Sequence, residues 1–163
     1  MDTLNIALFL WKIGLTSSDN LIAWVDNIIL SSTNPEQELV ELSLNGPDIC
    51  LKRPSYDFLA RPAELSFSEE FCLRASVLDI SSMESTNLFI KWATSYCMGE
   101  NLDDPLVMFC YKLEDLGGIH NGSQKQILFL SENIQNLMPH CLEFANTIFS
   151  QVQGLKLSYE VSS

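Results

Sequence analysis

The feature that most constrains the fold is a series of helix start and stop signals that runs along the whole chain. Between these signals, apolar residues recur at spacings of three and four, as in residues 4–15 and 21–29, and this period is typical of helices with a buried face. Asn34-Pro35 and Asp104-Pro105 each join a capping residue to a proline suited to a first helical turn. The pattern predicts an all-α fold.

The signals divide the chain into about seven helices joined by short loops. Short connections favour antiparallel neighbours, so we expect an irregular antiparallel helical bundle. The length suits one domain, and no repeat of fixed period occurs, so we expect a single helical domain over residues 1–163. The expected helices cover residues 4–14, 18–29, 35–44, 69–78, 82–98, 105–116 and 127–152, with Pro139 kinking or dividing the last.

Two segments depart from the helical pattern. Residues 46–67 contain Pro47, Pro54 and Pro62, which forbid one long helix. We expect an ordered connector there, with a short extended piece near residues 49–51. Residues 155–161 alternate apolar and polar positions, which is typical of a short strand or of an extended tail with one apolar face.

Charge is distributed unevenly along the chain. The formal net charge is −12, and Lys12 is the one basic residue among the first 51, which contain seven Asp and Glu. Such a composition disfavours binding to nucleic acid or to anionic membranes and favours a basic protein partner. The hydrophobic fraction of 47% nevertheless predicts a folded chain rather than a disordered acidic tail.

Cysteine usage and the N-terminal residues favour a cytoplasmic protein. The five cysteines are spread along the chain and flanked by apolar residues, as expected for free thiols in a reducing compartment rather than for a disulfide scaffold. The apolar residues 4–15 follow Asp2 and are interrupted by Lys12, unlike a signal peptide, and they are too few to span a bilayer. We therefore expect a cytoplasmic location and no membrane partner.

No motif for catalysis, metal binding or cofactor binding stands out. Gly117 and Gly122 have the separation found in a phosphate-binding loop, but Ser123 occupies the position of the required lysine. The two histidines, His120 and His140, have no second ligand at zinc-finger spacing. We expect no catalytic residue, no metal site and no cofactor. A cysteine and a histidine that meet only in the folded chain leave one further interpretation open, a small cysteine-dependent enzyme.

The candidate functional feature is an acidic face on the second and third expected helices. Its carboxylates lack basic neighbours with which to form intrahelical ion pairs, so a basic partner would relieve their mutual repulsion. We expect this face to bind a basic protein. The candidate contact residues are Asp19, Asp26, Glu36, Glu38 and Glu41.

Several short motifs also occur within the first 45 residues. They are Trp11-Lys12-Ile13-Gly14-Leu15, Ser18-Asp19, Ala23-Trp24-Val25-Asp26, Asn34-Pro35 and Glu41-Leu42-Ser43. Together they resemble small bacterial immunity proteins, which are encoded with contact-dependent growth-inhibition toxins. The resemblance implies a cytoplasmic protein without catalytic activity that binds one cognate toxin domain, often a basic nuclease, and blocks its active site. It identifies no individual contact residue.

A helical adaptor or scaffold subunit with an apolar interface is the alternative interpretation. In that case the interface would be formed by Trp24, which we expect to be exposed, and by the apolar residues after residue 154. The sequence leaves the oligomeric state and the identity of the partner open.

Overall fold

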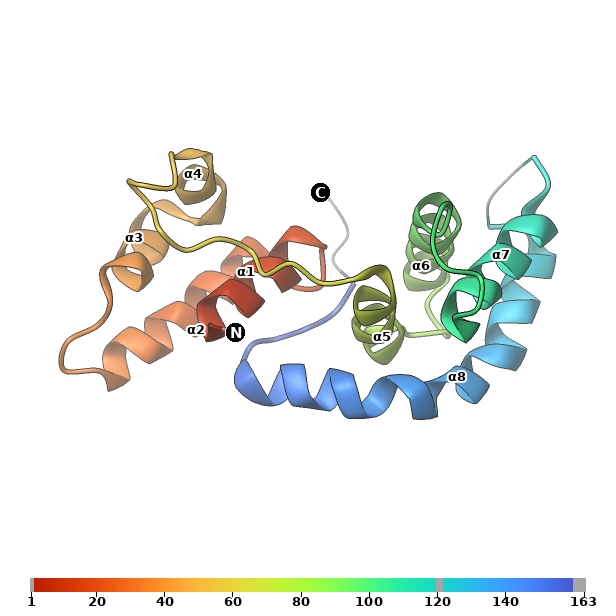
Figure 1. The fold of residues 1–163 in the computed structure, drawn as a ribbon. Helices are drawn as coiled ribbons and strands as arrows, with labels where there is room; N and C mark the ends of the chain where they lie inside the picture. The colour runs from red at the N-terminus through yellow and green to blue at the C-terminus, as the bar shows by residue number, and fades with distance from the viewer. Residues whose placement is uncertain (1, 120–121, 160–163) are drawn as a thin grey trace. The chain divides into compact units, whose positions relative to one another are not determined.

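The structure is a computed structural model that describes residues 2–119 and 122–159 (Figure 1). Eight helices and no β-strand occur among these residues, so the predicted all-α helical fold is confirmed. The chain gathers into two compact units. We call residues 1–64 together with 148–163 the split unit, and residues 65–147 the central unit. The expected single domain stays a prediction.

The split unit contains four complete helices and the last turn of a fifth. The first helix is buried on most of its sides, because six of its residues between Leu4 and Leu10 are buried, and this agrees with its nearly continuous apolar sequence. The second helix contacts both the first and the third. The four helices are α1 (Thr3–Lys12), α2 (Ser18–Ser31), α3 (Gln37–Asn45) and α4 (Pro47–Lys52).

The extended piece predicted near residues 49–51 is wrong, because these residues belong to α4. Gly46 has a φ of 76° and ends α3, and Pro47 takes the first position of α4. Proline suits that position because its missing N–H would have no partner there and its φ is already helical. The Gly-Pro pair that signals the end of one helix therefore also begins the next.

The remainder of the connector is ordered on α1, as predicted. The backbone carbonyl of Asn5 accepts a hydrogen bond from the Ala63 amide at 2.8 Å, and the Arg61 amide donates to the Asn5 side chain at 3.3 Å. Phe58 is almost fully buried. Asn5 of α1 thus binds the part of the connector that forms no helix.

The tail that follows α8 also belongs to the split unit. Residues 155–159 form neither helix nor strand, and Leu155 is buried, so the extended tail is found and not the strand. The Thr16 hydroxyl donates to the Lys156 carbonyl at 2.8 Å. Residues 160–161, which complete the predicted alternation, lie outside the described residues.

The central unit is built around a cluster of aromatic rings. Phe71 lies at its middle, with ring centroids 5.4 Å from Phe89 and 6.0 Å from Phe109. Phe67 stacks on Trp92 at 4.9 Å. The rings come from α5 (Phe67–Val77), α6 (Met83–Tyr96) and α7 (Pro105–Gly117), so the cluster binds these three helices together.

The last helix, α8, spans Gln124–Gln151 as one element. Pro139 lies inside it, and the ribbon of α8 changes direction along its length (Figure 1). A proline inside a helix removes one hydrogen bond and crowds the preceding turn, which bends the helix axis. Of the two predicted alternatives, a kinked helix or two abutting ones, the structure has the single helix.

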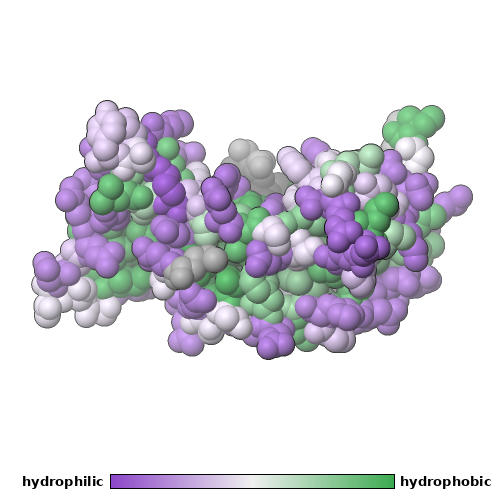
Figure 2. Space-filling view, viewed as in Figure 1, coloured by the Kyte–Doolittle hydropathy of each residue, from purple (hydrophilic) through white to green (hydrophobic). Residues whose placement is uncertain are grey.

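The surface mixes polar and apolar residues. Figure 2 shows hydrophilic side chains over much of the drawn face, with hydrophobic ones visible between them. Among the described residues, no helix combines the length and the apolar character that crossing a bilayer requires.

Candidate functional site

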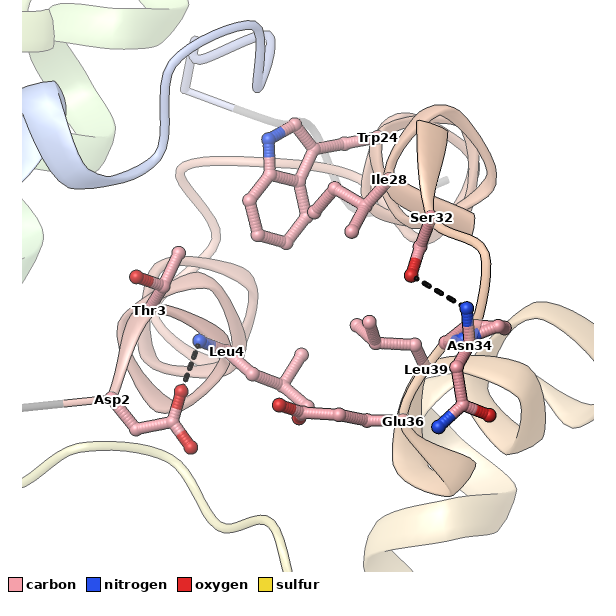
Figure 3. A pocket seen from close by; sticks show the side chains of 10 residues that line it. Asp2, Thr3, Leu4, Trp24, Ile28, Ser32, Asn34, Glu36 and Leu39 are labelled. Atoms are coloured by element: carbon pink, nitrogen blue, oxygen red, sulfur yellow. Dashed lines mark hydrogen bonds between the residues drawn. The ribbon is translucent and has the colours of Figure 1, made fainter. Parts of the chain in front are cut away.

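A groove of about 350 Å³ lies in the split unit between the start of α1, the second half of α2 and the start of α3 (Figure 3). Its walls carry two carboxylates, those of Asp2 and Glu36, and its apolar lining includes Leu4, Trp24 and Leu39. Ligand sites in proteins typically combine an apolar lining with a few polar groups that fix orientation. We therefore take this groove as the candidate site.

Asp2 is placed at the groove by its role as the N-cap of α1. The Leu4 amide donates a hydrogen bond to the Asp2 carboxylate at 3.0 Å, which satisfies one of the free amides of the first turn. The positive end of the helix dipole stabilises the negative charge at this position. One carboxylate oxygen is thus held by the helix, and the other forms no hydrogen bond with a described residue.

Glu36 is the N-cap of α3, but its side chain does not cap the helix. We expected Asn34 to cap this helix, but the helix begins at Gln37, and the Asn34 amide instead donates to the Ser32 hydroxyl at 3.3 Å. The exposed Glu36 side chain extends toward α1 (Figure 3). Its carboxylate makes no hydrogen bond or ion pair with any residue that the structure describes.

Trp24 forms an aromatic part of the groove. Its side chain is only 6% exposed, so the expectation of an exposed Trp24 is wrong. The indole N–H donates to the Gln153 carbonyl at 2.9 Å, and the indole lines the groove between α1 and α3 (Figure 3). The hydrogen bond fixes the orientation of the ring, so the ring is a rigid part of the lining.

Three of the five predicted contact carboxylates are available to a partner. Asp19 and Glu36 are exposed and Glu38 is half-buried. None of the three side chains is joined to another described residue by a hydrogen bond or an ion pair. Of the three, Glu36 lies at the groove. Whether any of them contacts a partner stays a prediction.

The other two predicted carboxylates have partners within the chain. Asp26 accepts a hydrogen bond from the Ser43 hydroxyl, which links α2 to α3. Glu41 forms an ion pair with Arg53, with Glu41 Oε2 and Arg53 Nη2 2.6 Å apart. This hydrogen-bonded guanidinium lowers the pKa of the Glu41 carboxyl below its ordinary value. The pair is not intrahelical, because Glu41 lies on α3 and Arg53 follows α4, so the basic neighbour of Glu41 comes from the connector.

The sequence analysis did not assign Asp2 to the candidate site. Its signal was present, because an aspartate directly before a helical apolar run is a typical N-cap. That signal predicts the start of the helix, but it does not predict which residue lies on the other side of the groove. Only the packing of both α1 and α3 against α2 brings Asp2 and Glu36 to the same groove.

The cysteines differ in reactivity, because a hydrogen bond with Cys72 lowers the pKa of the Cys141 thiol, and the interpretation as a cysteine-dependent enzyme stays a prediction. All five are buried, and burial raises the pKa of the Cys50, Cys97 and Cys110 thiols, which lowers the fraction of reactive thiolate. His140 is exposed on α8, and His120 lies outside the described residues. No group of three or more His, Cys, Asp or Glu that could hold a metal ion occurs in the described part of the chain.

Comparison with known proteins gives no relative for this chain. No protein-family model matches it, and neither a curated protein nor a solved structure does. The resemblance to immunity proteins over the first 45 residues therefore stays a prediction. Function has to be inferred from the groove and from the charges around it.

Proposed function

We propose that this protein is a non-catalytic inhibitor of the bacterial toxin-immunity kind, which binds a basic toxin domain through its split unit. The observation that carries the proposal is the groove in which Asp2 and Glu36 lie beside an apolar lining. A lysine or arginine has an apolar stem and a charged head, so such a groove suits a basic surface. The motifs that resemble immunity proteins lie within α1, α2 and α3 and the loops that join them, which also form the groove.

The charge of the split unit supports association with a basic partner. The unit contains ten acidic and five basic residues, a net charge of −5. Asp19 and Glu38, which have no ion-pair partner among the described residues, add to the negative potential on the helices that form the groove. Opposite charges on two proteins raise their association rate at low ionic strength, and rapid capture benefits an inhibitor.

Asp26 and Glu41 have a different role in this proposal. The hydrogen bond from Ser43 to Asp26 and the ion pair between Glu41 and Arg53 tie neighbouring segments together. These carboxylates keep α2, α3 and the connector in place and thereby hold one wall of the groove. We place the direct contacts at Asp2, Glu36 and Glu38 and treat Asp26 and Glu41, which are half-buried, as positioning groups.

The test is binding to the candidate toxin domain encoded beside this chain, measured with both purified proteins. We expect an association rate that falls with added salt and inhibition of the toxin by the complex. The double charge reversal Asp2→Lys with Glu36→Lys should weaken binding by roughly three orders of magnitude or more, since each truncated charge pair at an interface costs about 2–5 kcal/mol.

The matched control is Glu132→Lys with Glu143→Lys, which changes the net charge equally at two exposed positions on α8 in the central unit. We expect this control to bind with nearly unchanged affinity. An equal loss in both double variants, or an affinity that does not respond to salt, would overturn the proposal.

The adaptor alternative keeps one observation in its favour. Leu30 and Leu44 are 84% and 77% exposed, and large apolar side chains at such exposure sometimes mark a protein interface. Measurement of the molar mass in solution at low and high salt separates the two functions. A homo-oligomer whose assembly does not respond to salt, and which Leu44→Lys disrupts, would favour the adaptor.

A further inference from the structure

We propose that the groove takes a single arginine side chain, with the guanidinium between Asp2 and Glu36 and the aliphatic stem against Leu4 and Leu39. The inference rests on the proposed function only in naming a protein as the source of the arginine. The site itself follows from the size, charge and lining of the groove.

The size of the groove suits one side chain. Its volume of about 350 Å³ lies at the lower end of the range of small-molecule sites. Its apolar lining is short and comes from three helices, with Leu4 on α1, Trp24 on α2 and Leu39 on α3. This space can accommodate one long side chain inserted from a partner's surface, whereas a folded segment would need a longer trough.

The negative charge of the groove favours a cationic ligand. Asp2 and Glu36 bring two carboxylates from separate segments of the chain, and no lysine or arginine is among the described residues that line it. Among the described residues, no contact has to be broken for a ligand to enter, because Glu36 forms no side-chain hydrogen bond with any of them and Asp2 keeps its bond to the Leu4 amide through one oxygen. The second oxygen of Asp2 and both oxygens of Glu36 remain to accept hydrogen bonds.

Arginine fits these acceptors better than lysine does. The guanidinium group is planar and presents five N–H donors, so it can serve two carboxylates at once, and it is more weakly hydrated than an ammonium group. Trp24, whose N–H is bound to the Gln153 carbonyl, lines the opposite side of the groove from the two carboxylates (Figure 3).

The experiment is an NMR titration of the full ¹⁵N-labelled chain with N-acetyl-arginine amide. We expect saturable shifts in the Trp24 indole signal, identified with Trp24→Phe, and in the amides of residues 2–4 and 36–39. N-acetyl-lysine amide should bind more weakly by roughly an order of magnitude, and the uncharged N-acetyl-norleucine amide should give no saturable shift. Equal affinity for the lysine and arginine amides, or shifts confined to other residues, would overturn the proposal.

Three variants locate the site. Asp2→Asn removes the charge but keeps a residue that caps helices well, and Glu36→Gln removes the other charge; each should weaken binding of the arginine amide several-fold. Asp19→Asn is the matched control, because Asp19 is exposed on α2 and does not line the groove. An Asp19→Asn variant that loses as much affinity as the other two contradicts the assignment.

The two proposals can fail separately. If the arginine amide binds in the groove and the toxin domain binds the Asp2→Lys, Glu36→Lys variant as well as the natural chain, the arginine site stands and the proposed function is wrong. If toxin binding depends on both carboxylates and the arginine amide gives no saturable shift up to its solubility limit, the single-arginine site is wrong.

Discussion

The two units differ in how they use their carboxylates. The central unit has eleven acidic and four basic residues, a net charge of −7 against −5 for the split unit. Several of its acidic residues have structural tasks: Glu69 closes a capping box with Ser66, and Glu70 pairs with Arg74 at 2.9 Å. In the split unit Glu36 has no partner among the described residues. The comparison teaches that net charge does not locate the site, which is marked instead by two carboxylates that line one groove.

The interiors of the two units differ as well. The central unit is held by aromatic rings gathered around Phe71. The largest fully buried side chains of the split unit are mostly aliphatic, among them Ile6, Leu8, Leu15, Leu21 and Leu42. Trp24 lies at the edge of that interior, where it lines the groove. One unit uses its rings for packing, and the other places a ring where a ligand can reach it.

The largest expected effect is the loss of the central ring. Phe71→Ala should lower the free energy of unfolding by about 3–5 kcal/mol, because a fully buried phenylalanine leaves a cavity and loses its ring contacts. Urea denaturation measures the loss. Tyr96→Ala is the control, since Tyr96 is 65% exposed, and a surface change of this kind is expected to cost about 0.5 kcal/mol or less. Similar losses in both variants would show that the rings do not form the core.

Helix capping provides a second contrast between the units. Ser66→Ala in the central unit removes the hydrogen bond from the Glu69 amide to the Ser66 hydroxyl, which is 3.2 Å long. We expect a loss of about 1 kcal/mol in unfolding free energy, the usual cost of removing a serine cap. Ser95→Ala, at an exposed position on α6, is the control. A loss no greater than that of the control would contradict the role of the capping box.

At the start of α3 we expect a substitution to raise the free energy of unfolding rather than lower it. Glu36→Ser places a good capping residue where the natural side chain makes no capping bond, so the unfolding free energy should rise by up to about 1 kcal/mol. The same change removes a carboxylate from the groove and should weaken binding of the arginine amide. Thermal denaturation and the NMR titration measure the two effects. Stability and binding that fall together would contradict this explanation of Glu36.

The smallest effect concerns the ion pair between Glu41 and Arg53. The pKa of Glu41 in the folded chain lies below its usual value of 4.5, so the pair contributes its full stability above that value. The contribution is lost as the pH falls through the lowered pKa, where the folded carboxylate takes up its proton. Glu41→Gln should therefore be slightly less stable than the natural chain at neutral pH, and the difference should shrink in acid.

Thermal midpoints measured at about pH 7 and about pH 3 test this linkage. Glu38→Gln is the matched control, because Glu38 lies on the same helix and has no ion-pair partner among the described residues. A difference between the Glu41→Gln variant and the natural chain that stays constant with pH would contradict the ion-pair explanation.

Local signals allowed most of the helices to be predicted from the sequence. The cap and proline at Asp104-Pro105 start α7 as expected, and the apolar runs of α1 and α2 lie where the spacing placed them. The short helix α4 was missed because its six residues leave no room for a repeating pattern, and Gly46 was read only as a stop.

The candidate site depended on contacts that no spacing reveals. Asp2 and Glu36 lie far apart in the sequence and line the same groove because α1 and α3 both pack against α2. The partner of Glu41, Arg53, comes from the connector and not from the same helix. A helical pattern separates inner from outer faces, but it does not tell which outer carboxylate finds a basic neighbour in the folded chain.

The two segments of the split unit are synthesised at different times. The Trp24 indole donates to the carbonyl of Gln153, and the Ser158 amide donates to the carbonyl of Leu15. A ribosome must therefore translate the whole of residues 65–147 before it releases the segment that fixes the Trp24 ring. The central unit can fold as a unit of its own. The groove is complete only when the segment that contains Gln153 packs against α2, which is synthesised earlier.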